Sequence, residues 1–466
     1  MIEQVPARVP TLRRRRRSLL ALLPAALLSA CAGPAPAPEL PPIVFVHGNG
    51  DSAALWQAQV WRFESNGWPR GRLVAVNMPY PLARSDDTQP QEGRSSAAEQ
   101  ARYLAGEVDR VLKATGAKQV VLYGNSRGGN AIRSCIEGGC AGKVSHAILG
   151  GTPNHGIWSN PGFQPNSELN GAGPVLKGLN APKGPSGDEV TPGLAWMTLR
   201  SDNNDKYAQP EGVWIGAKGT PTGVTAEGPA LKGATNVVLP GRDHRELAYH
   251  ADAFAEAYRF ITGRDAARTE AVAEVRVVLD GLVTGEAAAG PTNLLLPGAR
   301  VAVYAVDAAT GQRRGAALVD KTVGADGHWG PITTDPNTPL EFELRAAGFA
   351  VTHIYRSPFP RSSALVHLRP ETFANADKDA VAVVTFVRPR AYFGLPRDAI
   401  LLDGQPAPGI PPGVAGVATS KLKLKDSGRS VVGEFRSGIV NERVAGIAWP
   451  AAQGDEQHLT VLELTN

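Results

Sequence analysis

The feature that most constrains this chain is a short apolar run that leads directly into a serine framed by glycines. Residues 120–123, Val-Val-Leu-Tyr, have the composition of a buried strand, and Gly124-Asn-Ser126-Arg-Gly128 follows at once. A G-x-S-x-G pattern is typical of a strand that turns sharply into a helix and raises the serine oxygen out of the fold. Both glycines are expected, because the turn leaves no room for a Cβ atom beside a strained residue. The sequence therefore predicts a strand–turn–helix unit with Ser126 at the turn.

The alternation of strand and helix extends over residues 43–263. Short apolar runs alternate with stretches whose apolar residues recur at helical spacing, and Ser96-Ala-Ala-Glu99 is a capping-box pattern at the start of one such stretch. This alternation predicts an α/β domain with a mostly parallel sheet covered by helices on both faces. The predicted strands are Ile43–Val46, Leu73–Val76, Val120–Tyr123, Ala147–Leu149, Trp196–Leu199 and Asn236–Leu239.

Residues 156–194 interrupt this alternation. They are rich in Gly, Pro and Asn, yet they carry apolar side chains such as Ile157, Trp158 and Leu169. A long irregular segment of this kind after a strand is often a lid over an active site, and the alternative is a structured excursion on the surface. Both interpretations stay open.

The sequence changes character after Arg264. Residues 264–272 are polar and predict a linker, and residues 273–466 show short strand patterns separated by Gly, Pro and Asp turns. Such spacing predicts a β-sandwich or β-barrel region, with Ala299–Val306 as its clearest strand. A block from about Val381 onward could continue this region or form a separate module. We find no catalytic pattern in this half.

The N-terminus has the composition of an export signal. Five arginines, Arg13–Arg17, precede an apolar stretch that is too short to span a membrane, and the junction resembles a twin-arginine signal. Leu28-Ser-Ala-Cys31 resembles a lipoprotein box, which would make Cys31 the lipidated first residue of the mature chain; the alternative is an ordinary cleaved signal. We therefore predict an export signal at residues 1–31, a Pro/Ala tether at 32–42, and a lipid-anchored protein in the periplasm or at the cell surface.

This signal also accounts for the net charge. The whole chain carries +4, but without the six arginines and one glutamate of residues 1–30 the balance is 42 basic against 43 acidic residues. The charge therefore gives no support to nucleic-acid binding. Two cysteines remain, Cys135 and Cys140, and in an oxidising compartment we expect them to form a local disulfide; the alternative is two free thiols. No Cys/His set has metal-ligand spacing, so no metal is predicted.

A nucleophilic serine needs a histidine base, a carboxylate that orients the histidine, and donors for the oxyanion. On such parallel sheets the three side chains follow in the order Ser, acid, His at the ends of strands. His244 follows the predicted strand 236–239 and precedes an amphipathic helix that begins at Leu247, which makes it the candidate base. The rivals are His146 at the start of a strand, His155, and His250 inside the predicted helix.

The acid should follow the preceding strand. Asp205 is the first candidate, because it closes the polar turn after Trp196–Leu199, and Asp202 is the alternative, which would otherwise bond locally and shape that turn. The oxyanion donors are predicted to be the backbone N–H groups of Asn49, in the loop after the first strand, and Arg127. His47 precedes the nucleophile and is interpreted as part of the loop structure.

Four motifs carry a resemblance to a known family: Val44-Phe-Val-His-Gly48, Gly124-Asn-Ser-Arg-Gly128, Gly151-Thr-Pro153 and Gly241-Arg-Asp-His244. With them the chain resembles bacterial lipases and esterases of the α/β-hydrolase superfamily over roughly residues 40–263. The β half, through Val301–Val306 and Phe342–Arg345, is similar to the C-terminal domain of archaeal-type two-domain lipases, a domain thought to help meet lipid substrate. Bacterial lipases usually have a histidine before the nucleophile, and Asn125 stands there instead, which leaves the substrate subclass open.

The resemblance and the residues together predict a serine carboxylic ester hydrolase that acts on an ester or lipid through Ser126, His244 and Asp205. No cofactor is expected. Two alternatives remain: another acyl hydrolase, such as a polyester depolymerase or an amidase, and a binding lipoprotein whose hydrolase half is inactive. Acyl chain length and oligomeric state stay open.

Overall fold

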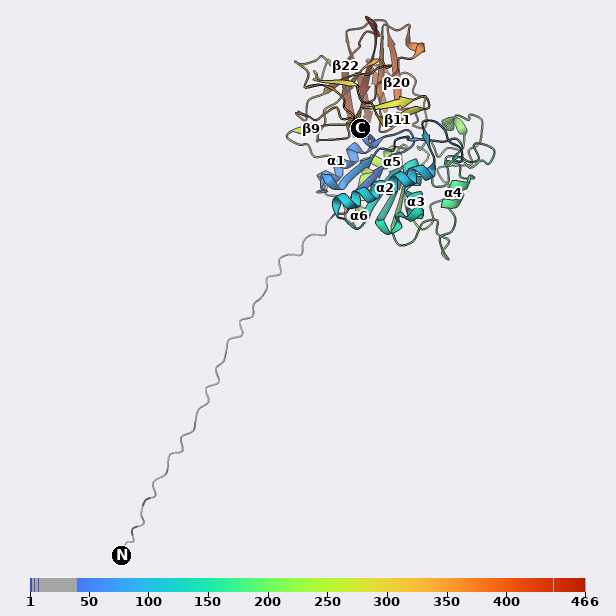
Figure 1. The fold of residues 1–466 in the computed structure, drawn as a ribbon, viewed down its shortest axis with the longest axis vertical. Helices are drawn as coiled ribbons and strands as arrows, with labels where there is room; N and C mark the ends of the chain where they lie inside the picture. Colours follow the sequence, from blue (N-terminus) through green and yellow to red (C-terminus); the bar gives the residue numbers. More distant parts are fainter. Residues whose placement is uncertain (2–3, 5–6, 8–39, 439, 466) are drawn as a thin grey trace. The chain divides into compact units, whose positions relative to one another are not determined.

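The first part of the fold is built on a six-stranded parallel sheet (Figure 1). The computed structural model describes residues 1, 4, 7, 40–438 and 440–465. The predicted lipidation residue Cys31, most of the export signal and most of the tether lie outside the described residues. The sheet has the order β2-β1-β5-β6-β7-β8, and every neighbouring pair is parallel. Its strands are β1 Ile43–Val46, β2 Leu73–Val76, β5 Val120–Asn125, β6 Val144–Gly150, β7 Ala195–Arg200 and β8 Thr235–Val238.

Helices cover both faces of this sheet, which confirms the predicted α/β class. Alternate residues of β1 face opposite layers: Phe45 packs into a core with Phe63 and Phe254, whereas Val46 packs with Leu104 of the other layer. A strand buried on both faces explains the continuous apolar runs in the sequence. The helices are α1 Gln57–Ser65, α2 Ala97–Thr115, α3 Arg127–Cys135, α4 Pro174–Leu179, α5 Glu246–Tyr249 and α6 Ala251–Thr262.

Two local details concern the helix ends. Ser96 and Glu99 form the predicted capping box at the start of α2. The prediction of one unbroken helix after His244 is wrong, because His250 has an extended backbone (φ −62°, ψ 158°) and separates α5 from α6. The His250 ring accepts a hydrogen bond from Asp252 N (3.2 Å), so this histidine caps the start of α6.

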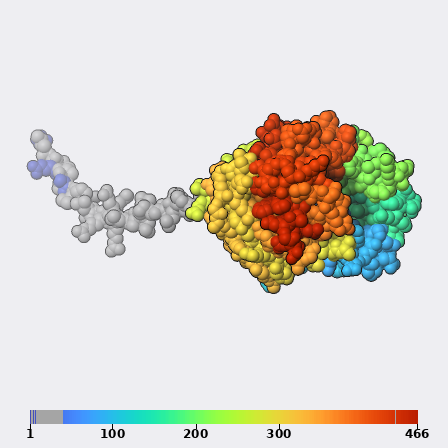
Figure 2. Space-filling view, turned by 90° about the horizontal axis from the view of Figure 1, so that it is seen from above, coloured from blue at the N-terminus to red at the C-terminus, as the bar shows by residue number. Residues whose placement is uncertain are grey.

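The C-terminal half is a sandwich of two β-sheets, as predicted. Figure 2 shows the surface of this half, on which the yellow, orange and red parts of the chain lie against one another. Gly433 of the smaller sheet lies so close to the larger one that an added Cβ would be 2.6 Å from the Phe386 ring. The larger sheet contains β13 Val319–Thr322, β12 Arg300–Ala305, β15 Leu340–Arg345, β16 Val351–Arg356, β24 Glu456–Glu463, β17 Ala382–Val387 and β20 Thr419–Leu424, with β23 Ala452–Gln453 beside β24. The smaller sheet contains β19 Gln405–Pro406, β18 Ala399–Leu402, β21 Ser430–Ser437 and β22 Val440–Ile447.

Short two-stranded ladders complete the architecture. They are β3 Leu82–Ala83 with β4 Arg94–Ser95, β10 Thr284–Ala287 with β11 Gly290–Leu295, and β9 Val277–Leu279 with β14 Ile332–Thr334.

From the sequence, the block after about Val381 could continue the preceding β region or form a separate module. The final strand, β24, joins the two. β24 lies between β16 and β17 and is parallel to both. Residues from about 381 onward therefore continue the sheet that residues 300–356 begin. We refer to residues 382–465 as the last β module.

The two halves of the chain pack against each other through buried contacts. Trp61 Nε1 of α1 donates to Ser362 O (3.0 Å), and the Trp61 ring lies 6.4 Å from that of Phe359. Gln57 Nε2 donates to Ser363 Oγ (2.9 Å). These contacts belong to one hydrophobic core that contains residues of both halves, so the β half is fixed against the sheet that carries the serine.

Two further observations bear on the predictions. Cys135 at the end of α3 is disulfide-bonded to Cys140. Among the described residues, no helix has the length and apolar character needed to cross a membrane.

Candidate active site

Ser126 lies at the sharp turn between β5 and α3 and has a strained backbone. Its φ of 53° and ψ of −125° fall outside the regions that residues with a side chain normally adopt. The flanking glycines are required by sterics: a Cβ on Gly124 would lie 2.7 Å from Gly129 N, and one on Gly128 would lie 2.4 Å from Val46 O. The turn therefore has the form that the sequence predicts.

Hydrogen bonds hold this turn against the neighbouring strand and against the segment of His244. Ser126 N donates to Gly150 O at the end of β6 (2.9 Å). The Asn125 side chain donates to Gly150 O (3.0 Å) and to His244 O (3.3 Å). The asparagine that replaces the usual histidine thus ties the serine turn to the segment that carries the candidate base.

His244 and Asp205 lie together, each after the end of a strand. His244 Nδ1 is 3.0 and 2.9 Å from the two carboxylate oxygens of Asp205, and both side chains are almost fully buried. Asp205 Oδ1 also accepts a hydrogen bond from Tyr207 N (2.8 Å). Because Nδ1 donates to the carboxylate, Nε2 carries the lone pair, and it has no hydrogen-bond partner among the described residues.

Asp202, the alternative acid, bonds within its own turn. Its carboxylate accepts from Asn204 N (3.1 Å), from the Ser201 hydroxyl (3.0 Å) and from Gly241 N (3.0 Å). It therefore lies in the turn and links that turn to the His244 loop, whereas Asp205 contacts the His244 ring.

Ser126 and His244 line one small cavity of about 50 Å³. Its walls come from the first-strand loop, the elbow, the irregular segment 156–194, the turn after β7, the His244 loop and the last β module. The lining residues are Asn49, Asp51, Ser126, Ile157, Leu169, Tyr207, His244, Arg245 and Tyr392. Residues 156–194 thus contribute apolar side chains to the wall of the site.

The two predicted oxyanion donors have different surroundings. Asn49 lines the cavity, and its side-chain oxygen accepts from Ala83 N (2.7 Å), which fixes the loop. Arg127 is the first residue of α3, so its N–H has no acceptor within the helix. The Arg127 side chain is buried elsewhere, where it pairs with Glu168 and donates to Ser95 O (2.6 Å). Only the backbone of Arg127 is therefore available to a substrate at Ser126.

The other histidines near the site have structural partners. His47 Nε2 accepts from Met78 N (3.0 Å) and Nδ1 bonds to Gly48 O (2.9 Å), while burial lowers the pKa of the ring. His155 bonds to the Glu189 carboxylate (3.2 Å). His146 is part of β6, and its ring nitrogen bonds to Ser145 Oγ (3.0 Å). These contacts agree with the interpretation of His47 as loop structure.

The loop that carries His244 is held by two arginines of the last β module. Arg388 binds Glu246 (2.7 Å) and approaches Asp243 (3.3 Å), and Arg397 binds Glu246 (2.9 Å). Asp243 and Glu246 are almost fully buried. Burial and the neighbouring Glu246 raise the pKa of Asp243 to about 6, and the two arginines oppose this rise. The residues on both sides of His244 are therefore held by side chains from the far end of the chain.

Aromatic and charged side chains surround the Ser126–His244 site. Arg245 pairs with Asp51 (2.5 Å), and its guanidinium carbon lies 4.9 Å from the centre of the Tyr392 ring. The Tyr207 ring meets the His244 ring edge-on, with 4.6 Å between centres. Burial lowers the pKa of Lys206, beside Asp205, to about 8.

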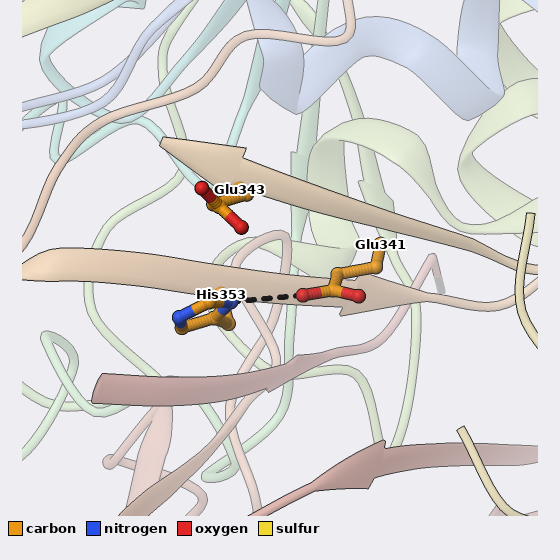
Figure 3. A group of neighbouring side chains, drawn as sticks. All are labelled: Glu341, Glu343 and His353. Atoms are coloured by element: carbon orange, nitrogen blue, oxygen red, sulfur yellow. Dashed lines mark hydrogen bonds and ion pairs between the residues drawn. The ribbon is translucent and has the colours of Figure 1, made fainter. Parts of the chain in front are cut away.

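One cluster outside this site has the residue types of a metal centre (Figure 3). Single ligand atoms of Glu341, Glu343 and His353, on β15 and β16, lie within 4.8 Å of one another. Arg313 already binds Glu341 and Glu343, each at 2.7 Å, and Arg345 binds Glu343 (2.7 Å). Since guanidinium groups occupy the carboxylates, the cluster fits a buried ion-pair network better than a cation site.

Sequence reasoning missed the contributions of Tyr207, Tyr392 and Arg388. Tyr207 could have been found, because it lies two residues after Asp205 in the same turn. Tyr392 and Arg388 carry no local signal, since they belong to the half without a catalytic pattern and reach the site only through tertiary packing.

Comparisons with known proteins agree with this architecture. Residues 41–157 match the family model for class 2 lipases, and residues 276–373 match that for the lipase C-terminal domain. A comparison with curated protein sequences gave no match. The last β module lies beyond both matched ranges.

Similar solved structures include lipases and esterases. The mature form of Bacillus licheniformis lipase BlEst2 is 19% identical over 49% of this chain and 95% of its own, with a TM-score of 0.34. Its propeptide form is 16% identical over 89% of this chain and 94% of its own, with a TM-score of 0.34. Esterase RhEst1 from Rhodococcus sp. ECU1013 is 18% identical over 48% and 90%, with a TM-score of 0.27.

Proposed function

We propose that this chain, a lipase/esterase-type carboxylic ester hydrolase of the α/β-hydrolase superfamily with a lipase C-terminal domain, works through a covalent acyl-enzyme on Ser126. In this proposal His244 is the general base, and Asp205 fixes the tautomer and orientation of its ring. Asp202 shapes the turn beside Asp205 and takes no part in the chemistry.

One observation carries the proposal. His244 Nδ1 is engaged by the Asp205 carboxylate, while Nε2 has no partner among the described residues and its ring lines the same cavity as Ser126. A buried imidazole nitrogen without a hydrogen-bond partner costs free energy, which is explained if its lone pair accepts a proton during the reaction. The hydroxyl proton of a serine that attacks a carbonyl carbon would satisfy it.

The steps follow from these assignments. Ser126 Oγ attacks the ester carbon as Nε2 takes its proton, and the negative charge collects on the former carbonyl oxygen. The N–H groups of Asn49 and Arg127 stabilise that oxygen. The tetrahedral intermediate collapses, the alcohol leaves with the proton from His244, and water attacks the acyl-enzyme by the same route in reverse.

The test is the reactivity of Ser126. Ser126→Ala is expected to lower the rate of ester hydrolysis at least about 10⁴-fold and to abolish labelling by a fluorophosphonate, with an unchanged circular dichroism spectrum. His244→Ala is the matched variant, because it keeps the serine but removes the base, and labelling should become very slow. Full activity in folded Ser126→Ala would overturn the mechanism.

We also propose that the enzyme is exported and held at a membrane by a lipid on Cys31, in the periplasm or at the cell surface. The support is the lipoprotein-box pattern at Leu28–Cys31 together with the arginines that precede it. The measurement is the distribution of the full chain between membrane and soluble fractions. Cys31→Ser should move the protein to the soluble fraction, and an unchanged distribution would contradict the lipid anchor.

A further inference from the structure

The acid and the base of the proposed mechanism are each followed in the chain by a cationic residue, and both cations lie over the same aromatic ring. Lys206 follows Asp205, and Arg245 follows His244. Lys206 Nζ lies 3.8 Å from the centre of the Tyr392 ring, and the Arg245 guanidinium carbon lies 4.9 Å from it. Both distances fall within the roughly 6 Å over which a cation is attracted to the face of a ring. The turn of the acid and the loop of the base therefore meet at one side chain of the last β module.

The Tyr392 backbone is fixed to the loop of the base, which gives the ring a defined place. Its N–H donates to Asp243 Oδ2 (2.9 Å). Its carbonyl accepts from Arg388 (2.7 Å) and from Arg397 (3.0 Å), and both arginines bind Glu246. Because Tyr392 is buried, solvent screens the attraction between its ring and the cations only weakly.

Lys206 has a second anchor in the last β module. Its Nζ donates to Gly416 O (2.8 Å). The Trp214 ring packs directly on Gly416, where an added Cβ would lie 2.0 Å from Trp214 Cη2, and Lys206 Nζ lies 5.5 Å from the centre of that ring. The acid turn is thus joined to the module by one hydrogen bond and by aromatic contacts.

The two ends of the acid turn are held in different ways. Near its start, Asp202 accepts from Gly241 N (3.0 Å) and so links the turn to the loop of the base. At its end, the hydrogen bonds of Asp205 among the described residues come from His244 and from residues 207–209 of the same turn. The position of this end therefore depends on the anchors of Lys206.

The charge of Lys206 is needed for these contacts. Burial and the nearby Arg245 lower the pKa of Lys206 to about 8, while Asp243, Asp205 and Asp51 oppose this fall. The ammonium group is therefore charged at neutral pH and loses its proton, and with it the attraction to the ring, as the pH rises above about 8. The titratable and charged groups that face Lys206 are Arg245, Asp51, Asp205, Asp243, Tyr207 and Tyr392.

We propose that Tyr392 is a positioning residue: through Lys206 and Arg245, its ring holds the acid turn and the base loop so that the Asp205 carboxylate orients the His244 imidazole. The inference rests on the proposed function. It assigns the alignment of acid and base to the last β module, which neither family model covers. Since a displacement of about 1 Å can cost on the order of 10²-fold in rate, the effect of this alignment should appear in kcat.

The experiment measures kcat and KM of the full chain with p-nitrophenyl butyrate. Tyr392→Leu keeps an apolar side chain but removes the aromatic face, and kcat is expected to fall about 10–100-fold with KM changed less than about threefold. Tyr392→Phe keeps that face and should keep kcat within about threefold. The matched control is Tyr304→Leu, because the Tyr304 ring contacts Arg313 (3.7 Å) but lies outside the site, and kcat should be unchanged.

Lys206 gives an independent route that leaves the ring in place, and it keeps the inference testable if Tyr392→Leu fails to fold. Lys206→Met should lower kcat about 10–100-fold, whereas Lys206→Arg keeps a cation over the ring and should restore most of the activity. The matched control is Lys218→Met, at an exposed lysine of the same segment, which should leave kcat unchanged.

The pH profile separates positioning by a charge from a contact that only stabilises the fold. In the unmodified protein kcat should decline above about pH 8, as Lys206 loses its proton. Lys206→Arg should move this decline to higher pH, because a guanidinium group stays protonated there. Circular dichroism spectra establish that each variant is folded.

Three outcomes would overturn the inference: folded Tyr392→Leu and Lys206→Met proteins that both keep kcat, a Tyr392→Phe protein that loses as much as Tyr392→Leu, or a decline at unchanged pH in Lys206→Arg. Ser126→Ala distinguishes this failure from failure of the mechanism. If Ser126→Ala is inactive while the other variants keep kcat, only the positioning role is wrong. If Ser126→Ala stays active, the proposed function itself is wrong.

Discussion

The segments that carry Ser126 and His244 lie side by side in the site but are built in opposite ways. The serine turn joins a strand and a helix that adjoin it in sequence, and a Cβ added to Gly124 or Gly128 would lie only 2.7 Å from Gly129 N or 2.4 Å from Val46 O. The His244 loop, by contrast, is held by Arg388 and Arg397, which lie in the last β module. The serine turn is therefore built and held within the catalytic half, whereas the His244 loop depends on arginines from the other half.

Because the His244 loop is held by Arg388 and Arg397, the β half contributes to the structure of the site. A domain that only attached the enzyme to a lipid surface would have no reason to contact Asp243 and Glu246 on either side of the candidate base. Here its arginines neutralise two buried carboxylates that would otherwise repel each other. The C-terminal half thus belongs to the structure of the site, and the following changes test the contrast between the two segments.

The largest effect is expected from the acid beside His244. Asp205→Asn should lower kcat about 10⁴-fold with the fold intact, because an amide at this position no longer favours the tautomer with a free Nε2. Asp202→Asn is the matched control and should change kcat less than about tenfold. If kcat fell more in Asp202→Asn than in Asp205→Asn, Asp202 would be the acid that orients His244, and Asp205 would only shape the turn.

The next largest effect is expected on stability, from the ion pairs that Arg388 forms between the two halves. Arg388→Met should lower the free energy of unfolding by about 3–5 kcal/mol, because it leaves the buried Glu246 and Asp243 with one arginine fewer. Urea unfolding measures the change. Arg429→Met, which breaks a partly exposed pair with Asp403, should cost at most about 1 kcal/mol. Equal losses in the two variants would mean that the His244 loop does not depend on Arg388.

A smaller effect is expected on the pH dependence of stability, through His250 at the end of α5. Burial, with the neighbouring Arg242, lowers the pKa of His250 to about 4, below the value near 6.5 of an unfolded chain. The unfolded chain then binds the proton first, so the stability from neutral His250 is complete above about pH 6.5 and is lost as the pH falls towards 4. The groups that face it are Arg242, Arg62, Glu246 and Asp252.

His250→Asn keeps an acceptor for Asp252 N and removes this titration. The loss of stability between pH 6.5 and 4 should shrink by on the order of 2 kcal/mol, which unfolding curves at both pH values would measure. An unchanged difference between the two pH values would show that His250 does not cause the acid sensitivity.

The smallest effect is expected in the serine turn. Ser126→Gly should raise the free energy of unfolding by up to about 1 kcal/mol while activity is lost, because glycine adopts the strained backbone at φ 53° without cost. Ser126→Ala keeps a Cβ and should bring no such gain. Equal stability of the two variants would mean that the turn stores no strain.

Much of the fold could be predicted because its signals are local. Short runs of three or four residues marked the six parallel strands, which have four to seven residues in the structure, and Ser96 and Glu99 marked the start of α2. The prediction of an unbroken helix after His244 was wrong, because the helical spacing of apolar residues continues across His250. The break depends on the extended backbone of that one residue, which the spacing of side chains does not reveal.

The sequence by itself determined the serine turn, since Gly124, Gly128 and the strand before them leave the backbone few alternatives. It also placed the candidate acid after β7 and the candidate base after β8, because the chain order of such a sheet is constrained. Only the tertiary structure decided that Asp205 rather than Asp202 lies against His244, that Arg388 holds the loop, and that Tyr392 lines the cavity. The physical reason is that these contacts join residues far apart in the chain, and neither composition nor spacing records which distant side chains folding brings together.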